Sequence, residues 1–238
     1  MSLDNFSTEI HPSDFMYNFL CEHAANDTSR AKEMYFGGGQ HDARQVVSSA
    51  TRFGFTSSRT SVLEFASGYG RVTRFLSDFS MNYMAADIHV DAVRFIRSHL
   101  DTNCMLSTAK PQEFVCRFRF DFIFVLSLFS HLPEEPFREW LSTLCGLLEP
   151  GGCLLFTTHG EAAVAKNDFL RKIYDPSAGF AFIESSEQKD LNGVEYGTTI
   201  SNASFVIDAI SKIPDCRLLS YTPDCWFGLQ DEWVLSRC

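Results

Sequence analysis

The sequence predicts an α/β sandwich of three layers, in which helices cover a mostly parallel sheet that ends in an antiparallel hairpin. Between residues 60 and 158, short apolar runs alternate with stretches of helical periodicity, a pattern typical of a parallel sheet. The run from Phe120 to Leu128 is nearly continuously apolar, as in a strand covered on both faces. The last two apolar runs, 217–221 and 232–236, are joined by a short loop and should pair antiparallel.

Two helices are expected before this alternation begins. Residues 13–21 place apolar side chains on one helical face behind a Ser13 cap, and a second helix is expected over residues 40–53. The three glycines at 37–39 predict a loop between them, either a plain turn or a backbone that another group approaches closely. Residues 1–59 are therefore predicted to form an N-terminal helical segment that contributes to the substrate pocket.

The elements of the central region follow from the spacing of its apolar residues. The helix that begins at Glu134 carries Pro136 in its first turn, where proline is tolerated, and Gly151-Gly152 follows its end. Strands are expected at 61–66, 82–87, near 104, at 120–128 and at 153–158, and helices at 71–79, 91–100 and 134–148.

The last third of the chain has a different pattern. Residues 161–200 have the character of an irregular insertion with a short helix at its start. An amphipathic helix with Ser201 as its cap is expected to reach Ile213, ahead of the two closing strands. Residues 60–238 are therefore predicted to form the second domain, which contains the insertion.

Composition and charge exclude several classes of partner. The 238 residues are 45% hydrophobic and 21% charged, with a formal net charge of −10, so the chain lacks the clustered cations that nucleic acids or anionic membranes require. No apolar run reaches the roughly 20 residues of a membrane span. The eight cysteines are dispersed, and no secretory leader is evident. We expect a cytoplasmic protein that acts on a small molecule; its oligomeric state is left open.

The most informative stretch is residues 62–71, VLEFASGYGR. A strand here ends in a turn of small residues that opens a helix, so a ligand can approach the backbone closely. Glu64 lies near the strand end, where a phosphate-binding turn would avoid negative charge. Asp87 ends the next strand, where a carboxylate can accept hydrogen bonds from ribose hydroxyls, and Thr73 replaces the third glycine of a dinucleotide fingerprint. This combination suits a cationic sulfonium ligand without a phosphate.

These residues carry a resemblance to a known family. EFASGYGRVTRFL resembles the first motif of class I S-adenosylmethionine-dependent methyltransferases, and AADI resembles their second. The stretch from FDFIFVL to LLFTTHG resembles their fourth strand, following helix and fifth strand, and the tail FGLQDEWVL is a looser match. The resemblance covers residues 62–160. It implies a Rossmann-like fold, S-adenosylmethionine as the cofactor and methyl transfer as the activity, and it does not identify the acceptor.

The resemblance also implies roles for single residues. Glu64 would orient the glycine loop and the amino group of the methionine moiety, Asp87 would hold the ribose, and Arg71 could meet the methionine carboxylate. Ala66 departs from the usual glycine and is expected to have a negative φ, and Thr108 replaces a common acid. The remaining expected cofactor contacts are Ala66, Gly68 and Gly70 along the turn, Ile88, Thr108 and Ala109 near the adenine, and Leu126 and Ser127 at the methyl-donor end.

Two histidines follow predicted strands at the edge of the sheet where ligands bind. His131 follows the fourth strand and His159 the fifth, and each is a candidate general base. In the alternative interpretation, His131 caps the following helix and His159 satisfies loop carbonyls. Arg74 is expected on a solvated helix face. Three tail residues could close over the acceptor or belong to the core: Tyr196, Trp226 and Gln230.

The sequence thus favours methyl transfer to an oxygen or nitrogen atom of a small, uncharged or cationic acceptor, which could be sugar- or lipid-linked. Oxygen is favoured because two histidines are available as bases. Two alternatives remain: a non-catalytic regulatory protein that binds S-adenosylmethionine, and a nicotinamide-dependent oxidoreductase. No zinc-binding spacing of His and Cys is present, so no metal is expected.

Overall fold

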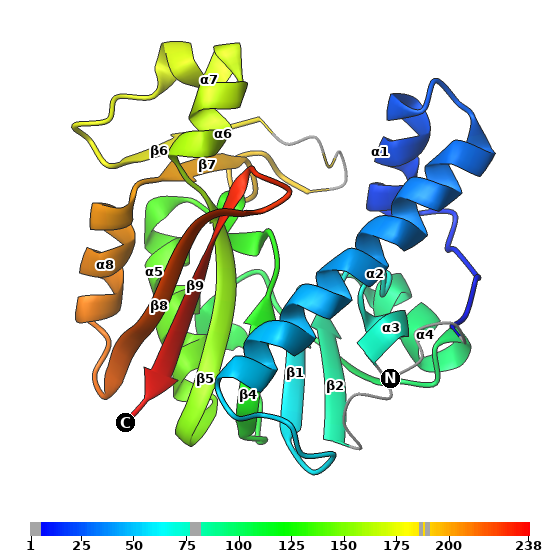
Figure 1. Cartoon of the computed structure of the whole chain (residues 1–238), viewed down its shortest axis with the longest axis horizontal. Helices are drawn as coiled ribbons and strands as arrows, with labels where there is room; N and C mark the ends of the chain where they lie inside the picture. Colours follow the sequence, from blue (N-terminus) through cyan, green and yellow to red (C-terminus); the bar gives the residue numbers. More distant parts are fainter. Residues whose placement is uncertain (1–5, 77–81, 186–187, 189–190) are drawn as a thin grey trace. The chain divides into compact units, whose positions relative to one another are not determined.

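The computed structural model describes residues 6–76, 82–185, 188 and 191–238. The chain divides into two compact units, an N-terminal unit of residues 1–109 and a C-terminal unit of residues 110–238. Figure 1 labels most of the helices and strands of both units.

The N-terminal unit contains three parallel strands in the spatial order β3-β2-β1. One helix follows β1 in the chain and another follows β2. The apolar face of α4 packs on β2 and β3 through Val93, Phe95 and Ile96, which accounts for its helical spacing of apolar residues. The described elements of this unit are, in chain order, α1 (Phe15–His23), α2 (Thr28–Arg52), β1 (Ser61–Phe65), α3 (Thr73–Leu76), β2 (Asn82–Asp87), α4 (Val90–His99) and β3 (Asn103–Leu106).

The two N-terminal helices differ from the prediction at their boundaries. α1 is capped by Asp14, whose side chain accepts a hydrogen bond from the backbone N–H of Tyr17, and the predicted cap at Ser13 is wrong. The predicted loop at residues 37–39 is also wrong, because α2 runs without interruption from Thr28 to Arg52. A Cβ at Gly39 would overlap the carbonyl oxygen of Arg71, so the glycine serves close packing inside a helix.

The helix predicted over residues 71–79 appears as the short α3, and residues 77–79 lie outside the described residues. β2 has the predicted bounds, and β1, α4 and β3 lie within one or two residues of their predicted positions.

In the C-terminal unit the strand order is β4-β5-β9-β8. β5 runs parallel to β4, whereas β9 is antiparallel to both β5 and β8, which gives the predicted hairpin. The described elements are η1 (Pro111–Glu113), β4 (Phe120–Val125), η2 (Leu128–Ser130), α5 (Glu134–Gly146), β5 (Leu148–His159), α6 (Glu161–Lys166), α7 (Asp168–Ile173), β6 (Phe180–Ile183), β7 (Thr198–Ser201), α8 (Ala203–Ser211), β8 (Cys216–Trp226) and β9 (Gln230–Arg237).

The insertion at residues 161–200 is more regular than predicted. It contains α6, α7 and the antiparallel pair β6–β7, in which Phe180 lies opposite Ser201. Ala163, Leu170, Tyr174 and Ile200 form a small apolar core for it. Because β7 includes Ser201, the cap of α8 is instead the next residue, Asn202, which accepts from the N–H of Phe205.

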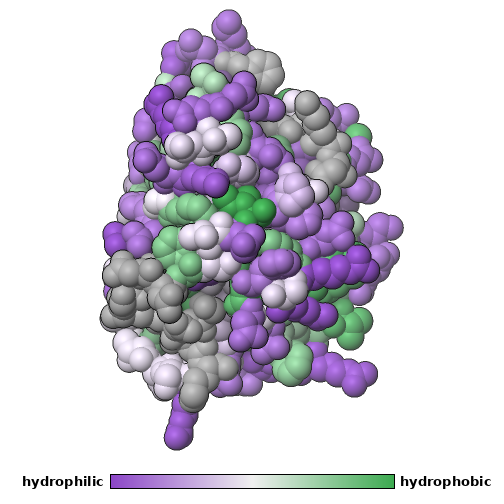
Figure 2. Space-filling view, turned by 90° about the vertical axis from the view of Figure 1, so that its right-hand side faces the viewer, coloured by the Kyte–Doolittle hydropathy of each residue, from purple (hydrophilic) through white to green (hydrophobic). Residues whose placement is uncertain are grey.

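The N-terminal unit has three parallel strands with helices, and the C-terminal unit has a parallel pair followed by an antiparallel hairpin. These features confirm the predicted class of fold, which is Rossmann-like, with mostly parallel strands and a terminal antiparallel hairpin. Figure 2 shows one face of the molecule, on which hydrophilic side chains predominate and hydrophobic ones form small groups. Within the ranges that the structure describes, no helix has both the length and the apolar composition needed to cross a membrane.

Candidate functional site

The turn after β1, residues 66–71, is called the glycine turn below. Ala66, Gly68 and Gly70 all have positive φ angles, of 60°, 55° and 76°. The expected negative φ at Ala66 is therefore wrong, and a left-handed alanine costs about 1 kcal/mol relative to glycine. A Cβ at Gly70 would overlap Cδ1 of Leu100, so glycine is required there for space as well as for conformation. At Gly68 a Cβ would meet no atom of the described residues within 4 Å, so the turn is open at this point.

Asp87 ties the end of β2 to the glycine turn. Its Oδ2 accepts a hydrogen bond from the N–H of Gly68 at 2.7 Å, and its Oδ1 accepts from the N–H of His89 at 2.9 Å. The ring Nδ1 of His89 also lies 2.9 Å from Oδ1. A carboxylate offers about four acceptor sites, so a site remains for a ligand hydroxyl. The carboxylate lies at the predicted strand end beside the predicted turn, and its contact with ribose stays a prediction.

Glu64 is buried beneath the turn. Its Oε2 accepts hydrogen bonds from the hydroxyls of Thr73, at 2.5 Å, and Tyr83, at 2.6 Å. Burial raises the pKa of Glu64 to about 7, and the two hydrogen bonds oppose that rise. Through Thr73 the side chain is linked to the start of α3. Its predicted roles, which are to orient the glycine loop and to contact the methionine amino group, stay predictions.

The two arginines of the turn have different surroundings. Arg71 forms an ion pair with Asp42 of α2, and its side chain is partly exposed. Arg74 is buried, so its predicted place on a solvated helix face is wrong. Its guanidinium donates to the carbonyl oxygens of Ser7 and Glu9, at 2.8 and 2.7 Å, because the N-terminal segment folds back over α3.

The predicted adenine contacts lie at the ends of β2 and β3. Ile88 and Thr108 are half-buried and Ala109 is exposed. The N–H of Ser107 donates to the carbonyl oxygen of Asp87 at 2.8 Å, which holds the two strand ends together. Their contact with a cofactor stays a prediction.

In the C-terminal unit, five residues near the ends of β4, β5 and β9 are called the histidine cluster below: Ser127, His131, His159, Tyr196 and Gln230. Ser127 follows Leu126 at the end of β4, has a φ of 64°, and is anchored by its N–H, which donates to Oγ1 of Thr157 at 2.8 Å. Gln230 links two of the members, because its Nε2 lies 3.1 Å from Oγ of Ser127 and 3.3 Å from Nε2 of His159.

His131 is held by the insertion. Its Nδ1 lies 2.7 Å from the carbonyl oxygen of Gly197, and the N–H of Gly197 donates to the carbonyl oxygen of His131 at 2.8 Å. The ring stacks on Tyr196, with 4.6 Å between centroids, and lies 6.1 Å from the ring of His159. Pro133 is the cap residue of α5, so the alternative in which His131 caps this helix is not what the structure shows.

Both imidazoles are neutral near pH 7. Burial lowers the pKa of His131, although the Gly197 carbonyl opposes this, and burial together with His131 lowers the pKa of His159 to about 4. A neutral His131 that donates from Nδ1 to a carbonyl oxygen has its proton on that nitrogen, so its Nε2 carries a lone pair. The arrangement can therefore accept a proton at Nε2 of His131.

Residues that the sequence did not predict complete both regions. Asp42 gives no motif signal, although it lies one helical turn after Gly38 and so shares a face with it. Gly197 was also missed: a Cβ there would lie 2.8 Å from the ring of Phe182. Trp226 is buried and donates to Glu232, so of the two interpretations offered for it the structure supports the core.

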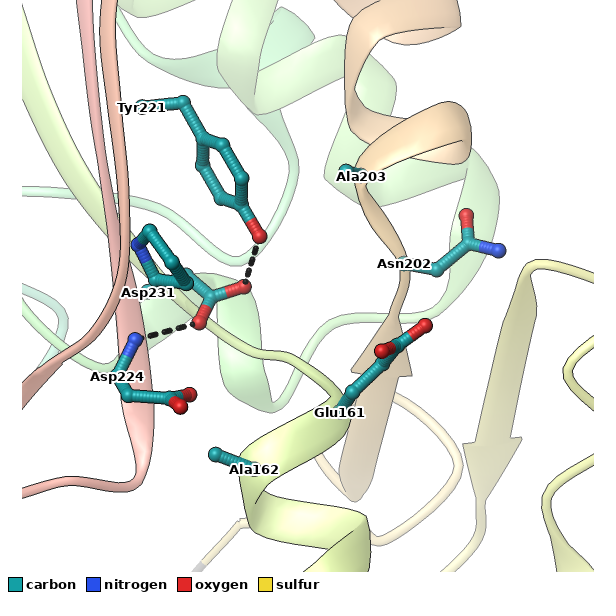
Figure 3. A pocket seen from close by; sticks show the side chains of 8 residues that line it. Glu161, Ala162, Asn202, Ala203, Tyr221, Asp224 and Asp231 are labelled. Carbon is teal, nitrogen blue, oxygen red and sulfur yellow. Dashed lines mark hydrogen bonds between the residues drawn. The ribbon is translucent and has the colours of Figure 1, made fainter.

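A separate cavity of about 200 Å³ lies in the C-terminal unit (Figure 3). Asp231 is buried at its wall and accepts hydrogen bonds from the hydroxyl of Tyr221, at 3.1 Å, and from the N–H of Asp224, at 3.0 Å. Successive side chains of a strand point to opposite faces, so Asp231 and Gln230 face opposite sides of β9. Among the described residues, no group of three or more His, Cys, Asp or Glu is arranged to hold a metal ion.

Comparison with known proteins places the chain in a family. A family model described as a methyltransferase domain matches residues 39–192, more than half of the chain. The chain belongs to this methyltransferase family, which confirms the predicted class, a class I S-adenosylmethionine-dependent methyltransferase. Among curated proteins, no match to the sequence is found.

Solved structures of similar fold are also methyltransferases. A S-adenosylmethionine-dependent methyltransferase from Clostridium acetobutylicum is 12% identical, with 82% of this chain and 90% of that one covered and a TM-score of 0.59. Magnesium protoporphyrin IX methyltransferase from Synechocystis, with bound SAH, is 13% identical, with 87% of each chain covered and a TM-score of 0.61. An amino pentose methyltransferase from Micromonospora echinaspora is 11% identical, with 84% and 92% covered and a TM-score of 0.59. At these identities the likeness concerns the fold.

Proposed function

We propose that this methyltransferase transfers the methyl group of S-adenosylmethionine to an oxygen or nitrogen atom of a small molecule, with His131 as the general base. The observation that carries the proposal is the hydrogen bond between Nδ1 of His131 and the carbonyl oxygen of Gly197, at 2.7 Å. It leaves Nε2 of a neutral imidazole as the proton acceptor. His159, which contacts Gln230, is the second candidate base.

The glycine turn fits this cofactor. Three features suit a nucleoside whose ribose offers two hydroxyls: backbone with positive φ at three positions, space at Gly68 with no described atom within 4 Å of a Cβ, and an acceptor carboxylate at Asp87. The sulfonium of the cofactor supplies an already activated methyl group. The acids Glu64 and Asp87 lie at the glycine turn, and acidic side chains there favour a cationic nucleoside over a dinucleotide with two phosphates.

His131 then needs only to position the acceptor and remove its proton. The acceptor hydroxyl or amine would donate to Nε2, and the proton would stay there as the acceptor atom gains its methyl group, while the other proton stays on Nδ1 and is donated in the hydrogen bond to the carbonyl oxygen of Gly197. A hydroxyl must lose its proton during transfer, so the presence of two neutral imidazoles favours an oxygen acceptor.

The acceptor is proposed to be an uncharged or cationic small molecule, including sugar- or lipid-linked compounds. The neutral side chains of the histidine cluster and the net charge of −10 support this class over nucleic acids. The insertion at 161–200 is proposed to form part of the pocket because it supplies Tyr196 and Gly197. Three expectations stay predictions: the division into residues 1–59 and 60–238, the role of residues 1–59 in the pocket, and a cytoplasmic location.

The test is a screen of hydroxyl and amine compounds for release of S-adenosylhomocysteine, followed by the variant His131→Gln. With an accepted compound, we expect a loss in kcat of about 100-fold or more, because general base catalysis contributes that much. An equally conservative change at the exposed His99 is the control and should leave the rate unchanged. A wild-type rate in His131→Gln would contradict the assignment of the base, and a protein that binds the cofactor without turning over any compound would favour the regulatory alternative.

A further inference from the structure

Asp42 and Arg71 form an ion pair at the glycine turn, in which Asp42 is buried and Arg71 is partly exposed. Arg71 follows Gly70 directly, and its Nη2 donates to Oδ2 of Asp42 on α2, 29 residues earlier. The approach depends on the glycines of α2. A Cβ at Gly38 would lie 3.1 Å from Nη1 of Arg71, and one at Gly39 would overlap the Arg71 carbonyl oxygen. The glycine face of α2 therefore makes the space in which Arg71 lies.

This ion pair is incomplete if its only purpose is stability. Asp42 is 1% exposed, and among the described residues its Oδ1 has no hydrogen-bond partner. Burial raises the pKa of Asp42, and Arg71 opposes the rise. Buried ion pairs contribute little net stability relative to apolar side chains of the same size, and an unsatisfied buried oxygen adds a cost. Its position at the ligand turn therefore indicates a role in binding.

Arg71 has donors available for a ligand. A guanidinium carries five N–H donors, Asp42 accepts from one of its nitrogens, and 20% of the side chain is exposed. Arginine binds a carboxylate through two parallel hydrogen bonds, which requires a fixed orientation of the guanidinium plane. Asp42 can fix that orientation, because its carboxylate is buried on the 25-residue helix α2.

We infer that Asp42 is a positioning residue for cofactor binding, which holds Arg71 in the orientation that receives the α-carboxylate at the amino-acid end of the cofactor. The inference rests on the proposed function. It makes Asp42, which lies on a helix before the sequence motif, a determinant of specificity for nucleosides with an amino-acid end over nucleosides without one.

The test compares two ligands by calorimetric titration. S-adenosylhomocysteine carries the amino-acid end, and 5′-methylthioadenosine has the same nucleoside and thioether without it. We expect Asp42→Asn to weaken binding of S-adenosylhomocysteine about tenfold and to change binding of 5′-methylthioadenosine by less than about twofold. The matched control is Asp14→Asn: Asp14 is also a buried acid, bonded to Tyr35, and asparagine serves equally well as a helix cap. This control should leave the affinities for both ligands near their wild-type values.

A double-mutant cycle separates positioning from a general effect on the fold. If Asp42 acts through Arg71, then Asp42→Asn should cause no further loss in the Arg71→Gln background. Equal weakening of both ligands by Asp42→Asn, an unchanged affinity for S-adenosylhomocysteine, or additive losses in the cycle would overturn the inference. Wild-type protein that binds both ligands equally tightly would overturn it too and leave the proposed function standing, whereas wild-type protein that binds neither would overturn both.

Discussion

The glycine turn of the N-terminal unit and the histidine cluster of the C-terminal unit are built in opposite ways. The turn is surrounded by buried ionisable side chains, because Glu64, Asp87 and Arg74 all lie within hydrogen-bonding reach of it or of α3. The cluster consists of neutral groups, with both histidine pKa values lowered by burial. Ionisable side chains suit a site for a charged cofactor, and neutral side chains suit a site for an acceptor that must lose a proton.

The two regions also differ in how far apart their parts lie in the sequence. Gly68 and Asp87 are 19 residues apart, and Glu64 and Thr73 are nine apart. In the cluster, by contrast, Ser127 contacts Gln230 across 103 residues. Local contacts make the turn a short motif, whereas the cluster exists only after the insertion and the hairpin have folded.

The largest effect is expected for the buried charge at Glu64. Burial raises its pKa from 4.5 to about 7. The stability that comes from this shift is fully present below about pH 4.5 and is lost as the pH rises through 7, because Glu64 must then ionise while buried. Glu64→Gln keeps the shape without the charge. From pH 5 to pH 8, the wild-type protein should therefore lose up to about 3 kcal/mol of unfolding free energy that the Glu64→Gln variant does not lose.

Denaturant unfolding at pH 5, 6.5 and 8 measures this gain. The exposed Glu113 provides the control, since Glu113→Gln should differ little from wild type at every pH. If the difference in unfolding free energy between Glu64→Gln and wild type stays constant with pH, then the cost of burying a charge at Glu64 is not what distinguishes the glycine turn from the histidine cluster.

A smaller effect is expected when the long-range contact of the cluster is disturbed. A Cβ at Gly197 would overlap the carbonyl oxygen of Ile183 and lie 2.8 Å from the Phe182 ring. Gly197→Ala should therefore lower the free energy of unfolding by about 2 kcal/mol and shift the imidazole signals of His131 in NMR spectra. Gly146→Ala, which places a methyl group at the end of α5 with no described atom within 4 Å, should have no such effect. Equal stability of the two variants would contradict the tight packing around Gly197.

The smallest effect concerns the backbone of the turn. Ala66 has a φ of 60°, so Ala66→Gly should stabilise the protein by up to about 1 kcal/mol in thermal unfolding. Gly54 also has positive φ, at 90°, and Gly54→Ala should change stability in the opposite direction. A destabilised Ala66→Gly variant would mean that the methyl group of Ala66 contributes more by packing than its conformation costs.

The parts of the protein that could be predicted from sequence are those set by local chemistry. The strand, turn and helix around residues 62–76 follow from apolar spacing and small residues, and Asp87 was found because it ends the next strand. The predictions that failed depended on distant contacts. Arg74 is buried by Ser7 and Glu9, more than 60 residues earlier, and the glycines at 37–39 stay helical because packing on α3 outweighs their low helix propensity.

The histidine cluster was predicted in part for a related reason. His131 and His159 could be proposed because both follow strands whose carboxyl ends meet at one edge of a parallel sheet. Tyr196 could be proposed only as a residue that closes over the acceptor or belongs to the core. The hydrogen bond between His131 and Gly197 could not be predicted, because a segment between two predicted elements carries no periodic signal that fixes its path.

The most direct test of the central claim is calorimetric titration of the purified protein with S-adenosylhomocysteine, with NADH as the control ligand. Micromolar binding of S-adenosylhomocysteine, no binding of NADH, and a loss of about 100-fold in affinity in Asp87→Ala are the predicted results, because Asp87 is expected to accept the ribose hydroxyls. Absence of S-adenosylhomocysteine binding, or an unchanged affinity in Asp87→Ala, would contradict the assignment of the glycine turn as the cofactor site.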